Sequence, residues 1–233
     1  MTLYDMFSLI NYITNKDFSG NVITPARFKE LIKVVNIDLF RNKYGLPEEY
    51  QPGRPIPMEF ADITLKNTDD LKPFKTFLPS TPVTIGVLPF PLNYAHRDTV
   101  TYNYSKTING VATSLPKGVE ILREAEYAER NGNYTKRPTP ANPIGVVRSD
   151  GIHIRPLTIT AVDFSYYRWP NAPVFTYVQG DGYITYDAAS STEFEFAPDE
   201  HLTLVSMILK YVGINLRESD LIQVANQQLQ TGK

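Results

Sequence analysis

The sequence predicts an α+β fold, in which N- and C-terminal helices form a helical bundle with an inserted antiparallel β-sheet and proline-rich extended arms. Three observations lead to this prediction. Apolar residues recur at helical spacing near both ends of the chain, alternate at strand spacing in its second half, and give way to clustered prolines between them. With 233 residues and 42% hydrophobic content, the chain can build the core of a single domain over residues 1–233.

Residues 1–45 are expected to form a helical pair. The apolar residues that recur at helical spacing are Phe7, Ile10 and Ile13 in the first helix and Phe28, Leu31, Ile32, Val35 and Leu39 in the second. Thr24 followed by Pro25 is typical of a helix start, because the threonine hydroxyl can accept a bond from a free backbone N–H and proline suits the first turn. Tyr44-Gly45 is a C-terminal signal, so we expect the second helix to end there.

Residues 46–115 are expected to form a proline-rich arm and a hairpin. Nine of the 18 prolines fall between Leu46 and Leu92, and each removes a backbone donor and restricts the residue before it. Long helices are therefore not expected here. The segment VTIGVLPFPL suits an edge strand, where proline is tolerated. The segment TVTYNYSKTING then predicts a hairpin that turns at Asn109-Gly110.

Residues 116–197 are expected to form a short helix followed by a small antiparallel sheet. The helix is predicted over about 119–130 from an apolar stripe of Ile121, Leu122, Ala125 and Ala128. Hairpin turns are predicted at 150–151 and 180–182, where glycine follows or flanks aspartate. The strand between them, LTITAVDFSYYRW, alternates, with Val162, Phe164 and Tyr166 on one face.

Residues 198–233 are expected to form a C-terminal helix pair. Pro198 suits a first turn, and Gly213 is expected to end the first of these helices. Ser219 is a predicted cap for a last helix over about 220–230. Helices at both ends of the chain then pack together, and the strands lie in the sequence between them.

Composition excludes several classes of function. The 25 acidic and 23 basic residues give a formal charge of −2, which creates no broad field to attract nucleic acid or an anionic membrane. Without cysteine there is no disulfide, thiolate metal site or cysteine nucleophile. His96, His153 and His201 lie far apart and outside any metal-binding spacing. We therefore expect no enzyme, cofactor or metal, and, since no stretch approaches about 20 apolar residues, a soluble protein.

Two alternatives to a structural role stay open. Glu193 and Glu195 in TEFEFAP would lie about 7 Å apart on one face of a strand, a spacing that suits an inverting glycosidase, although ordinary solvent-facing alternation is the favoured explanation. A carbohydrate-binding or adhesion module would instead use an aromatic sheet face. The residues of that exposed stacking platform would be Tyr166, Tyr167, Trp169 and Tyr177.

Three blocks of the chain resemble structural proteins of tailed bacteriophages, especially neck and ring proteins of the crAss-like phages and their relatives that infect Bacteroidetes. The first is LINYITNKDFSGNVITPARFKELIKVVNIDLFRNKYGLPEEYQPGRPIP. The second is VEILREAEYAERNG followed by RPTPANPIGVVRSDGIHIRPLTITAVDFSYYRWPNAPVF, and the third is STEFEFAPDEHLTLVSMILKYVGINLRESDLIQVANQQ. Together these blocks cover about two thirds of the chain, and residues 75–115 lie outside them.

The resemblance implies a non-enzymatic head-to-tail connector, an adaptor or neck subunit that bridges portal and tail. It implies a virion protein of the neck or tail region, assembled in the host cytoplasm as a closed, twelvefold ring. The implied partners are other copies of the chain, the portal protein and neighbouring neck or tail ring proteins. DNA could pass through the ring lumen, but neither sequence-specific nucleic-acid binding nor membrane binding is expected.

A ring also requires two different complementary faces on each subunit, because one heterologous contact repeats until the rotation closes. Near-neutral charge, aromatic strands and proline-stiffened arms could supply such faces. We therefore expect residues 46–92 to reach a neighbouring subunit or ring. The candidate interaction residues are Pro52, Arg54, Pro55 and Pro57 in the arm and Tyr166, Tyr167, Arg168 and Trp169 in the aromatic strand.

Overall fold

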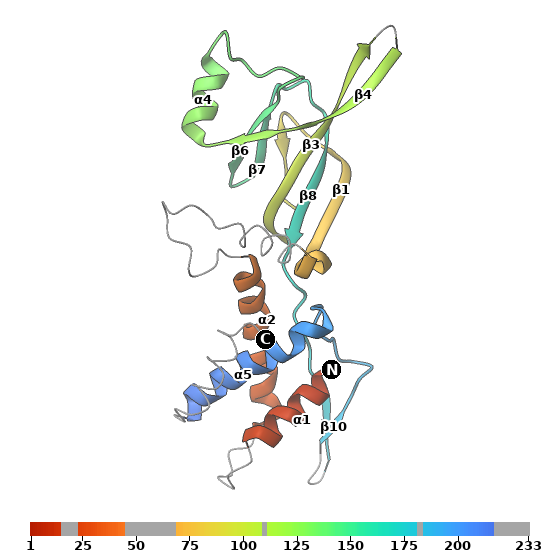
Figure 1. Cartoon of the computed structure of the whole chain (residues 1–233), viewed down its shortest axis with the longest axis vertical. Coiled ribbons are helices and arrows are strands. Elements are labelled where there is room, and N and C mark those ends of the chain that lie inside the picture. Colours follow the sequence, from red (N-terminus) through yellow and green to blue (C-terminus); the bar gives the residue numbers. More distant parts are fainter. Residues whose placement is uncertain (15–22, 45–68, 109–110, 181–183, 217–233) are drawn as a thin grey trace. The chain divides into compact units, whose positions relative to one another are not determined.

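A computed structural model gives the fold of the protein (Figure 1). It describes residues 1–14, 23–44, 69–108, 111–180 and 184–216. The chain has a mixed α+β fold, as predicted, and divides into two compact units where one domain is expected. The helical unit comprises Met1–Pro73 and Pro170–Lys233, and the β unit comprises Phe74–Trp169. Both ends of the chain thus contribute to one unit, and the other is inserted between them in sequence.

In its described residues, the helical unit has three long helices and a short hairpin. Its elements are α1 (Leu3–Thr14), α2 (Pro25–Tyr44), the 3-10 turn η2 (Pro198–Glu200), α5 (His201–Leu216), β9 (Tyr177–Gln179) and β10 (Ile184–Tyr186). The predicted N-terminal helical pair is confirmed, and α2 begins as expected, with the Thr24 hydroxyl accepting a bond from the Arg27 N–H at 3.4 Å. Helix α5 continues beyond Gly213 to Leu216. The last helix expected over 220–230 lies outside the described residues.

Aromatic rings connect the elements of the helical unit. Phe7 of α1, Phe28 of α2 and Phe175, which precedes β9, have ring centroids 5.2–5.3 Å apart from one another. Phe28 and Phe175 are fully buried. Offset and edge-to-face aromatic contacts of this kind stabilise a core beyond the area that they bury. The apolar stripe read from the sequence of α2 therefore faces this core.

The β unit contains two four-stranded sheets and one helix. The first sheet has the order β1-β8-β3-β4 and is antiparallel throughout. Its strands are β1 (Lys75–Pro82), β8 (Ala161–Arg168), β3 (Tyr94–Ile108) and β4 (Val111–Gly118). The second sheet has the order β2-β7-β6-β5. Its strands are β2 (Val87–Leu88), β7 (Gly151–Arg155), β6 (Ile144–Arg148) and β5 (Glu120–Leu122), with β5 parallel to β6.

The core of the β unit forms where the alternating strand was predicted. Val162, Phe164 and Tyr166 all lie on one face of β8, are at most 2% exposed and belong to one buried cluster. Residues from both sheets join this cluster, including Val100 of β3 and Ile152 of β7. Period-two alternation thus identified the buried face of this strand correctly.

The strands of all three predicted hairpins are paired, and residues 109–110 and 181–183 of two of the turns lie outside the described residues. Their closing pairs are Ile108↔Val111 between β3 and β4, Arg148↔Gly151 between β6 and β7, and Gln179↔Ile184 between β9 and β10. At Gly151 the backbone has φ of +152°, and a Cβ there would lie 2.3 Å from the carbonyl oxygen of Leu88. Glycine is therefore required at this turn, because strand β2 passes too close for any side chain.

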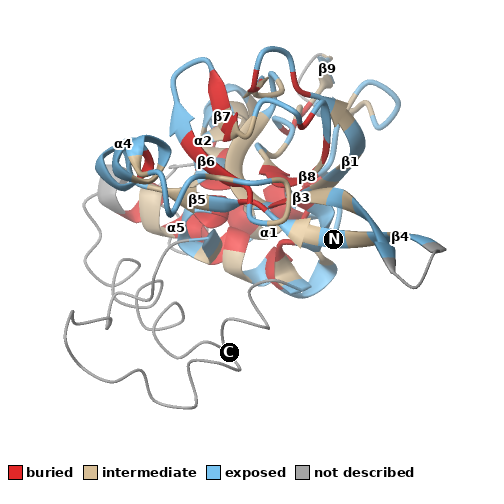
Figure 2. Cartoon of the chain, turned by 90° about the horizontal axis from the view of Figure 1, so that it is seen from above, coloured by how far each residue is buried: buried red, intermediate tan, exposed pale blue. Residues whose placement is uncertain are grey.

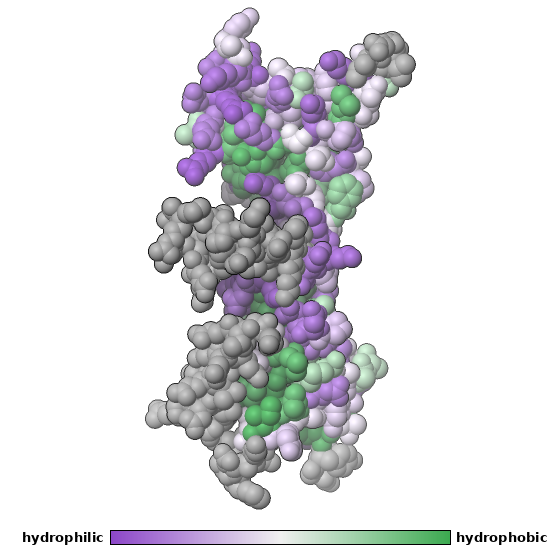
Figure 3. All heavy atoms as spheres, in the orientation of Figure 1, coloured by the Kyte–Doolittle hydropathy of each residue, from purple (hydrophilic) through white to green (hydrophobic). Residues whose placement is uncertain are grey.

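The short helix was predicted with the wrong start. Helix α4 spans Glu124–Gly132, and the apolar residues Ile121 and Leu122 lie instead in strand β5. The cause is that apolar residues in a strand and in the first turn of a helix cannot be distinguished over so short a run. Hydrophilic residues gather over α4 in the space-filling view (Figure 3).

Much of the expected proline-rich arm is strand or lies outside the described residues. Residues 75–82 form β1 and residues 87–88 form β2, both edge strands of their sheets, as the prolines require. Of the expected arm, residues 46–68 lie outside the described part of the chain. Among the described residues, no helix is both long enough and apolar enough to cross a bilayer.

Candidate functional site

The candidate interaction residues of the arm cannot be placed. Pro52, Arg54, Pro55 and Pro57 all lie outside the described residues, so their role stays a prediction.

The candidate interaction residues of the aromatic strand are mostly buried. Tyr166 is 2% exposed and Tyr167 is 6% exposed. Strand β8 lies between β1 and β3, so both of its backbone edges are paired. The Lys75 ammonium lies over the ring of Tyr167, 5.8 Å from the ring centroid. The prediction that these tyrosines form an exposed stacking platform is therefore wrong, because the side chains of Tyr166 and Tyr167 are both buried. Trp169, at 37% exposed, remains accessible.

Arg168, a candidate interaction residue, and Tyr177, a member of the expected aromatic platform, remain to be placed. The Arg168 guanidinium lies 5.8 Å from the ring centroid of Phe74, a cation–π contact within the β unit. Tyr177 belongs to β9 of the helical unit and has its ring 6.0 Å from that of Phe175. The four aromatic residues proposed as one platform are thus divided between two units.

The two carboxylates of the possible glycosidase have structural partners. Glu193 accepts hydrogen bonds from the Leu3 N–H at 2.6 Å and the Tyr186 hydroxyl at 2.7 Å. Burial, together with this contact to Glu193, raises the pKa of Tyr186. The Leu3 N–H is one of the free donors at the start of α1, so Glu193 satisfies a group that helix geometry leaves open.

Glu195 makes a comparable contact elsewhere. Its carboxylate accepts from the Asn171 backbone N–H at 2.8 Å and from the Asn171 side-chain amide at 2.9 Å. Neither Glu193 nor Glu195 belongs to a strand, so the expectation that they share one strand face is wrong. The carboxylates instead connect chain segments far apart in sequence, which strand periodicity could not indicate.

The three histidines occupy separate environments. His96 packs against Trp169, His201 Nδ1 lies 3.0 Å from the Met1 ammonium, and His153 Nε2 lies 2.8 Å from Asp150. Burial lowers the pKa of both His96 and His201. These positions present no pair of ring nitrogens to a common point.

A partly buried charge network lies in the helical unit. Lys43, near the end of α2, donates to Asp70 at 2.8 Å and to Glu200 at 2.7 Å. Asp199 lies beside the two acids, and the three carboxylates could bring oxygens within 4.8 Å of one another. The Lys43 ammonium already contacts two of these carboxylates directly. We therefore interpret the group as a structural ion network.

The pKa of Lys43 reflects this balance. Burial alone would lower it, but the hydrogen bonds to Asp70 and Glu200 outweigh burial, so the pKa of Lys43 is raised. The charged ammonium is therefore the stable form in the folded protein. Its place in the last turn of α2 also suits the negative end of the helix dipole.

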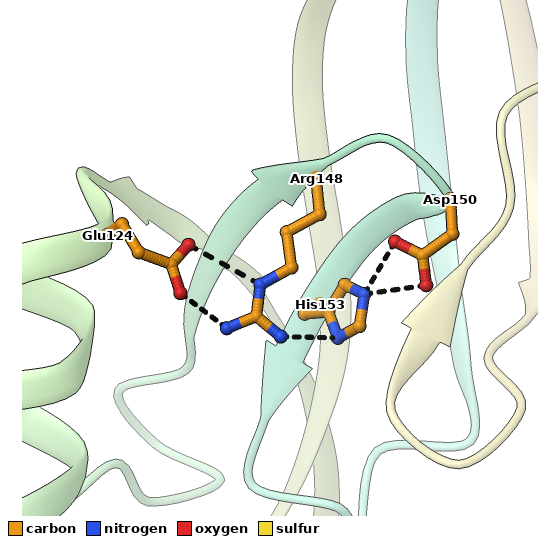
Figure 4. Close-up of polar contacts among 4 residues, drawn as sticks. All are labelled: Glu124, Arg148, Asp150 and His153. Carbon is orange, nitrogen blue, oxygen red and sulfur yellow. Dashed lines mark hydrogen bonds and ion pairs between the residues drawn. The ribbon is translucent and has the colours of Figure 1, made fainter.

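A second, exposed network lies in the β unit (Figure 4). Arg148 at the end of β6 pairs with Glu124 in the first turn of α4, and its guanidinium lies 5.9 Å from the ring centroid of Tyr127. Next to it, His153 Nδ1 is 3.4 Å from Arg148 Nη1, and His153 Nε2 contacts both Asp150 oxygens at 2.8 and 2.9 Å. The network therefore joins α4 to the β6–β7 hairpin.

The electrostatics of this second network favour the charged carboxylates. The hydrogen bond from Arg148 lowers the pKa of Glu124, and the hydrogen bond from His153 lowers the pKa of Asp150. Sequence reasoning missed this network, because Glu124 and Arg148 are 24 residues apart and no local pattern connects them.

A polar hollow of about 290 Å³ opens at one end of the first sheet of the β unit. Its lining residues are Ser80, Tyr102, Asn103, Thr158, Thr160, Ala161, Val162 and Asp163. Asp163 holds a central position, since its carboxylate accepts from the Ser80 N–H at 2.8 Å and from the Asn103 amide at 3.3 Å. Nothing in the sequence indicated that these three segments meet.

A two-stranded ribbon extends from the same sheet. Strand β3 pairs with β8 only as far as Thr101, and residues 102–108 pair with β4 alone. In Figures 1 and 2 this ribbon continues past the start of β8, and those of its side chains that the structure describes are half-buried or exposed. We call residues 102–118 the β3–β4 ribbon.

No protein-family model matches the sequence of this chain, and no curated protein matches it.

Proposed function

We propose that the protein is a structural subunit of a tailed-phage virion, a ring-forming head-to-tail connector of the neck that bridges portal and tail. The sequence resemblance motivates this proposal, and the β3–β4 ribbon is the structural observation that carries it. The proposed partners are other copies of the chain in a closed, twelvefold ring, the portal protein and neighbouring neck or tail ring proteins. The proposed location is the neck or tail region of the virion.

The ribbon supports this proposal because an isolated chain provides it with no further strand or packed face. A two-stranded β-ribbon is marginally stable in water, and it needs a further strand or a packed face to become stable. In the described structure, β4 is the last strand of its sheet, and an edge strand is the kind of element to which another chain can add a strand. Contact with a neighbouring subunit would supply what the ribbon lacks.

The organisation of the chain supports the same proposal. We infer a helical bundle built from both chain ends, with the sheet inserted between them, so that each subunit offers two surfaces of different character. A closed ring needs such a pair of unlike faces, because its contacts are heterologous. In this proposal the β3–β4 ribbon and residues 46–68 are the segments that reach the neighbouring subunit.

Shortening the ribbon tests this proposal. Replacing residues 104–115 by Asn-Gly closes the hairpin at the pair Asn103↔Pro116 with a two-residue turn. We expect native mass spectrometry and electron microscopy to show closed rings for the natural chain and monomers for the shortened one. The buried cluster of the β unit lies outside the deleted segment, so the variant should keep its fold.

Circular dichroism and thermal unfolding provide the control for folding of the shortened chain. A natural chain that stays monomeric at its highest soluble concentration would contradict ring formation by the protein alone. Rings that persist in a folded, shortened chain would contradict the role given to the ribbon.

A further inference from the structure

The polar hollow of the β unit has the features of a built binding site, beginning with a distorted strand. Strand β1 shifts its register against β8 between Leu78 and Thr81, so Pro79 and Ser80 form a bulge. Ser80 has φ of +48°, a left-handed conformation that costs energy for a residue with a side chain. Bulges of this kind commonly re-aim a group beside a functional site.

The group positioned by this bulge is the carboxylate of Asp163. The Ser80 N–H donates to Asp163 Oδ1, and the Asn103 amide donates to Asp163 Oδ2. Each carboxylate oxygen can accept about two bonds, so each keeps capacity for another donor. The carboxylate is thus held from two neighbouring strands, β1 and β3, while it faces the hollow.

The remaining lining residues are mostly hydroxyl groups. Thr158 and Thr160, in the segment before β8, and the Ser80 side chain can each donate and accept. The Asn103 amide carries a second N–H beyond the one directed at Asp163. Half-buried Tyr102, which packs against the core of the β unit, adds an aromatic wall. Among the described residues that line the hollow there is no Lys, Arg or His.

This chemistry selects among ligand classes. A phosphate or carboxylate ligand would be repelled by Asp163 and find no cation among the lining residues. An apolar ligand would bury Asp163 and Asn103 without replacing their hydrogen bonds to water. Divalent metal ions usually take several carboxylate ligands, and this hollow offers one.

We propose that this hollow binds a neutral saccharide, with one sugar ring in contact with the protein. Vicinal hydroxyls of the sugar donate to Asp163 and accept from Asn103, while the apolar C–H face of the ring packs against Tyr102. A volume of about 290 Å³ suits one such ring, since it lies at the lower end of the range for ligand pockets. The site shares no residue with the aromatic platform expected from the sequence, and two of its lining residues, Tyr102 and Asn103, lie at the base of the β3–β4 ribbon.

Saturation-transfer NMR on the full chain tests the proposal. The probes are methyl β-D-glucopyranoside, methyl β-D-galactopyranoside and methyl α-D-mannopyranoside, each titrated separately. We expect at least one to bind with Kd of about 1 mM, as suits an open site with few polar contacts. The variant Asp163→Asn, which keeps the shape of the side chain and loses its charge, should weaken that binding by about tenfold or more.

Asp187→Asn is the matched control. Asp187 also accepts bonds from backbone N–H groups, those of Ala189 and Ser190, but it lies in the helical unit. Its replacement should leave saccharide binding unchanged. Should Asp163→Asn fail to fold, Thr160→Val removes one exposed hydroxyl with little change in size and should also weaken binding.

Three results would overturn the proposal. The first is that none of the three glycosides gives a saturation-transfer signal with the folded natural chain. The second is that the folded Asp163→Asn or Thr160→Val variant binds as tightly as the natural chain. The third is that Ca²⁺ binds at Asp163 and no glycoside does, which would make the hollow a cation site.

Discussion

Two charge networks, one in each unit, connect distant parts of the chain with different degrees of burial. In the helical unit the side chains of Lys43, Asp70 and Glu200 are 20%, 13% and 9% exposed. In the β unit the side chains of Arg148 and Glu124 are 42% and 61% exposed. Both networks join segments that lie far apart in sequence, but water reaches the second much more freely.

The difference shows that burial, more than the number of contacts, determines what a charge network contributes. Ion pairs exposed to water gain little, because solvent screens them and the side chains lose freedom. Partly buried charges cost more to desolvate, so the loss of one partner leaves the others in an unfavourable place. We therefore expect the two networks to respond very differently to the same kind of substitution.

The largest effect is expected from Lys43→Met, which removes the ammonium and keeps an apolar stem. Asp70 and Glu200 then face each other without a cation in a partly buried place. Removal of one partner from a buried ion pair typically lowers the free energy of unfolding by about 3–5 kcal/mol. Urea unfolding monitored by circular dichroism would measure this change.

Lys33→Met is the matched control in the same helix. Lys33 pairs with Glu30 at 3.0 Å, and their side chains are 41% and 71% exposed. Substitution there should change the free energy of unfolding by no more than about 0.5 kcal/mol. Equal effects of the two substitutions would show that burial does not distinguish these lysines.

The same contrast explains what could be predicted from the sequence. Helix α2 and the buried face of β8 were predicted correctly, because apolar spacing depends on neighbouring residues and the core lies on one side. The partners of Lys43 could not be predicted, because Glu200 lies 157 residues away. Periodicity carries no information about such a contact.

The candidate site was still less predictable. Asp163 occupies an ordinary alternating position in β8, and its role depends on a bulge in β1 and an amide in β3. Glu193 was expected on the solvent face of a strand, yet it accepts a bond from the first turn of α1, 190 residues away. In each case the tertiary fold, and not a local pattern, decides what the side chain contacts.

A smaller effect is expected in the pH dependence of stability, from one partly buried histidine in each unit. Burial, together with the charge of the Met1 ammonium, lowers the pKa of His201, which follows Glu200; burial also lowers the pKa of His96 in the β unit. The unfolded chain then binds protons more readily than the folded chain. Stability should therefore fall as the pH drops through the unfolded value of 6.5, and the loss is complete below the folded pKa.

The exposed network should respond in a more acidic window. Because the hydrogen bond from His153 lowers the pKa of Asp150, the contribution of Asp150 to stability is present above the unfolded value of 3.8 and is lost as the pH falls through the folded pKa.

For the two histidines, urea midpoints measured between about pH 7 and pH 5 should fall for the natural chain. A double variant, His96→Asn with His201→Asn, should lose most of that fall; an unchanged slope would contradict the assignment.

The smallest effect is expected from the exposed pair of Arg148 and Glu124. A double-mutant cycle with Arg148→Ala and Glu124→Ala isolates their interaction from the contact between Arg148 and the Tyr127 ring. At low salt the cycle should show a small coupling, about one degree in the unfolding temperature. Because the Debye length falls to about 3 Å in 1 M salt, most of that coupling should disappear there. A coupling that survives in high salt, or that matches the effect of Lys43→Met, would mean that α4 shields the pair from solvent far better than its exposure indicates.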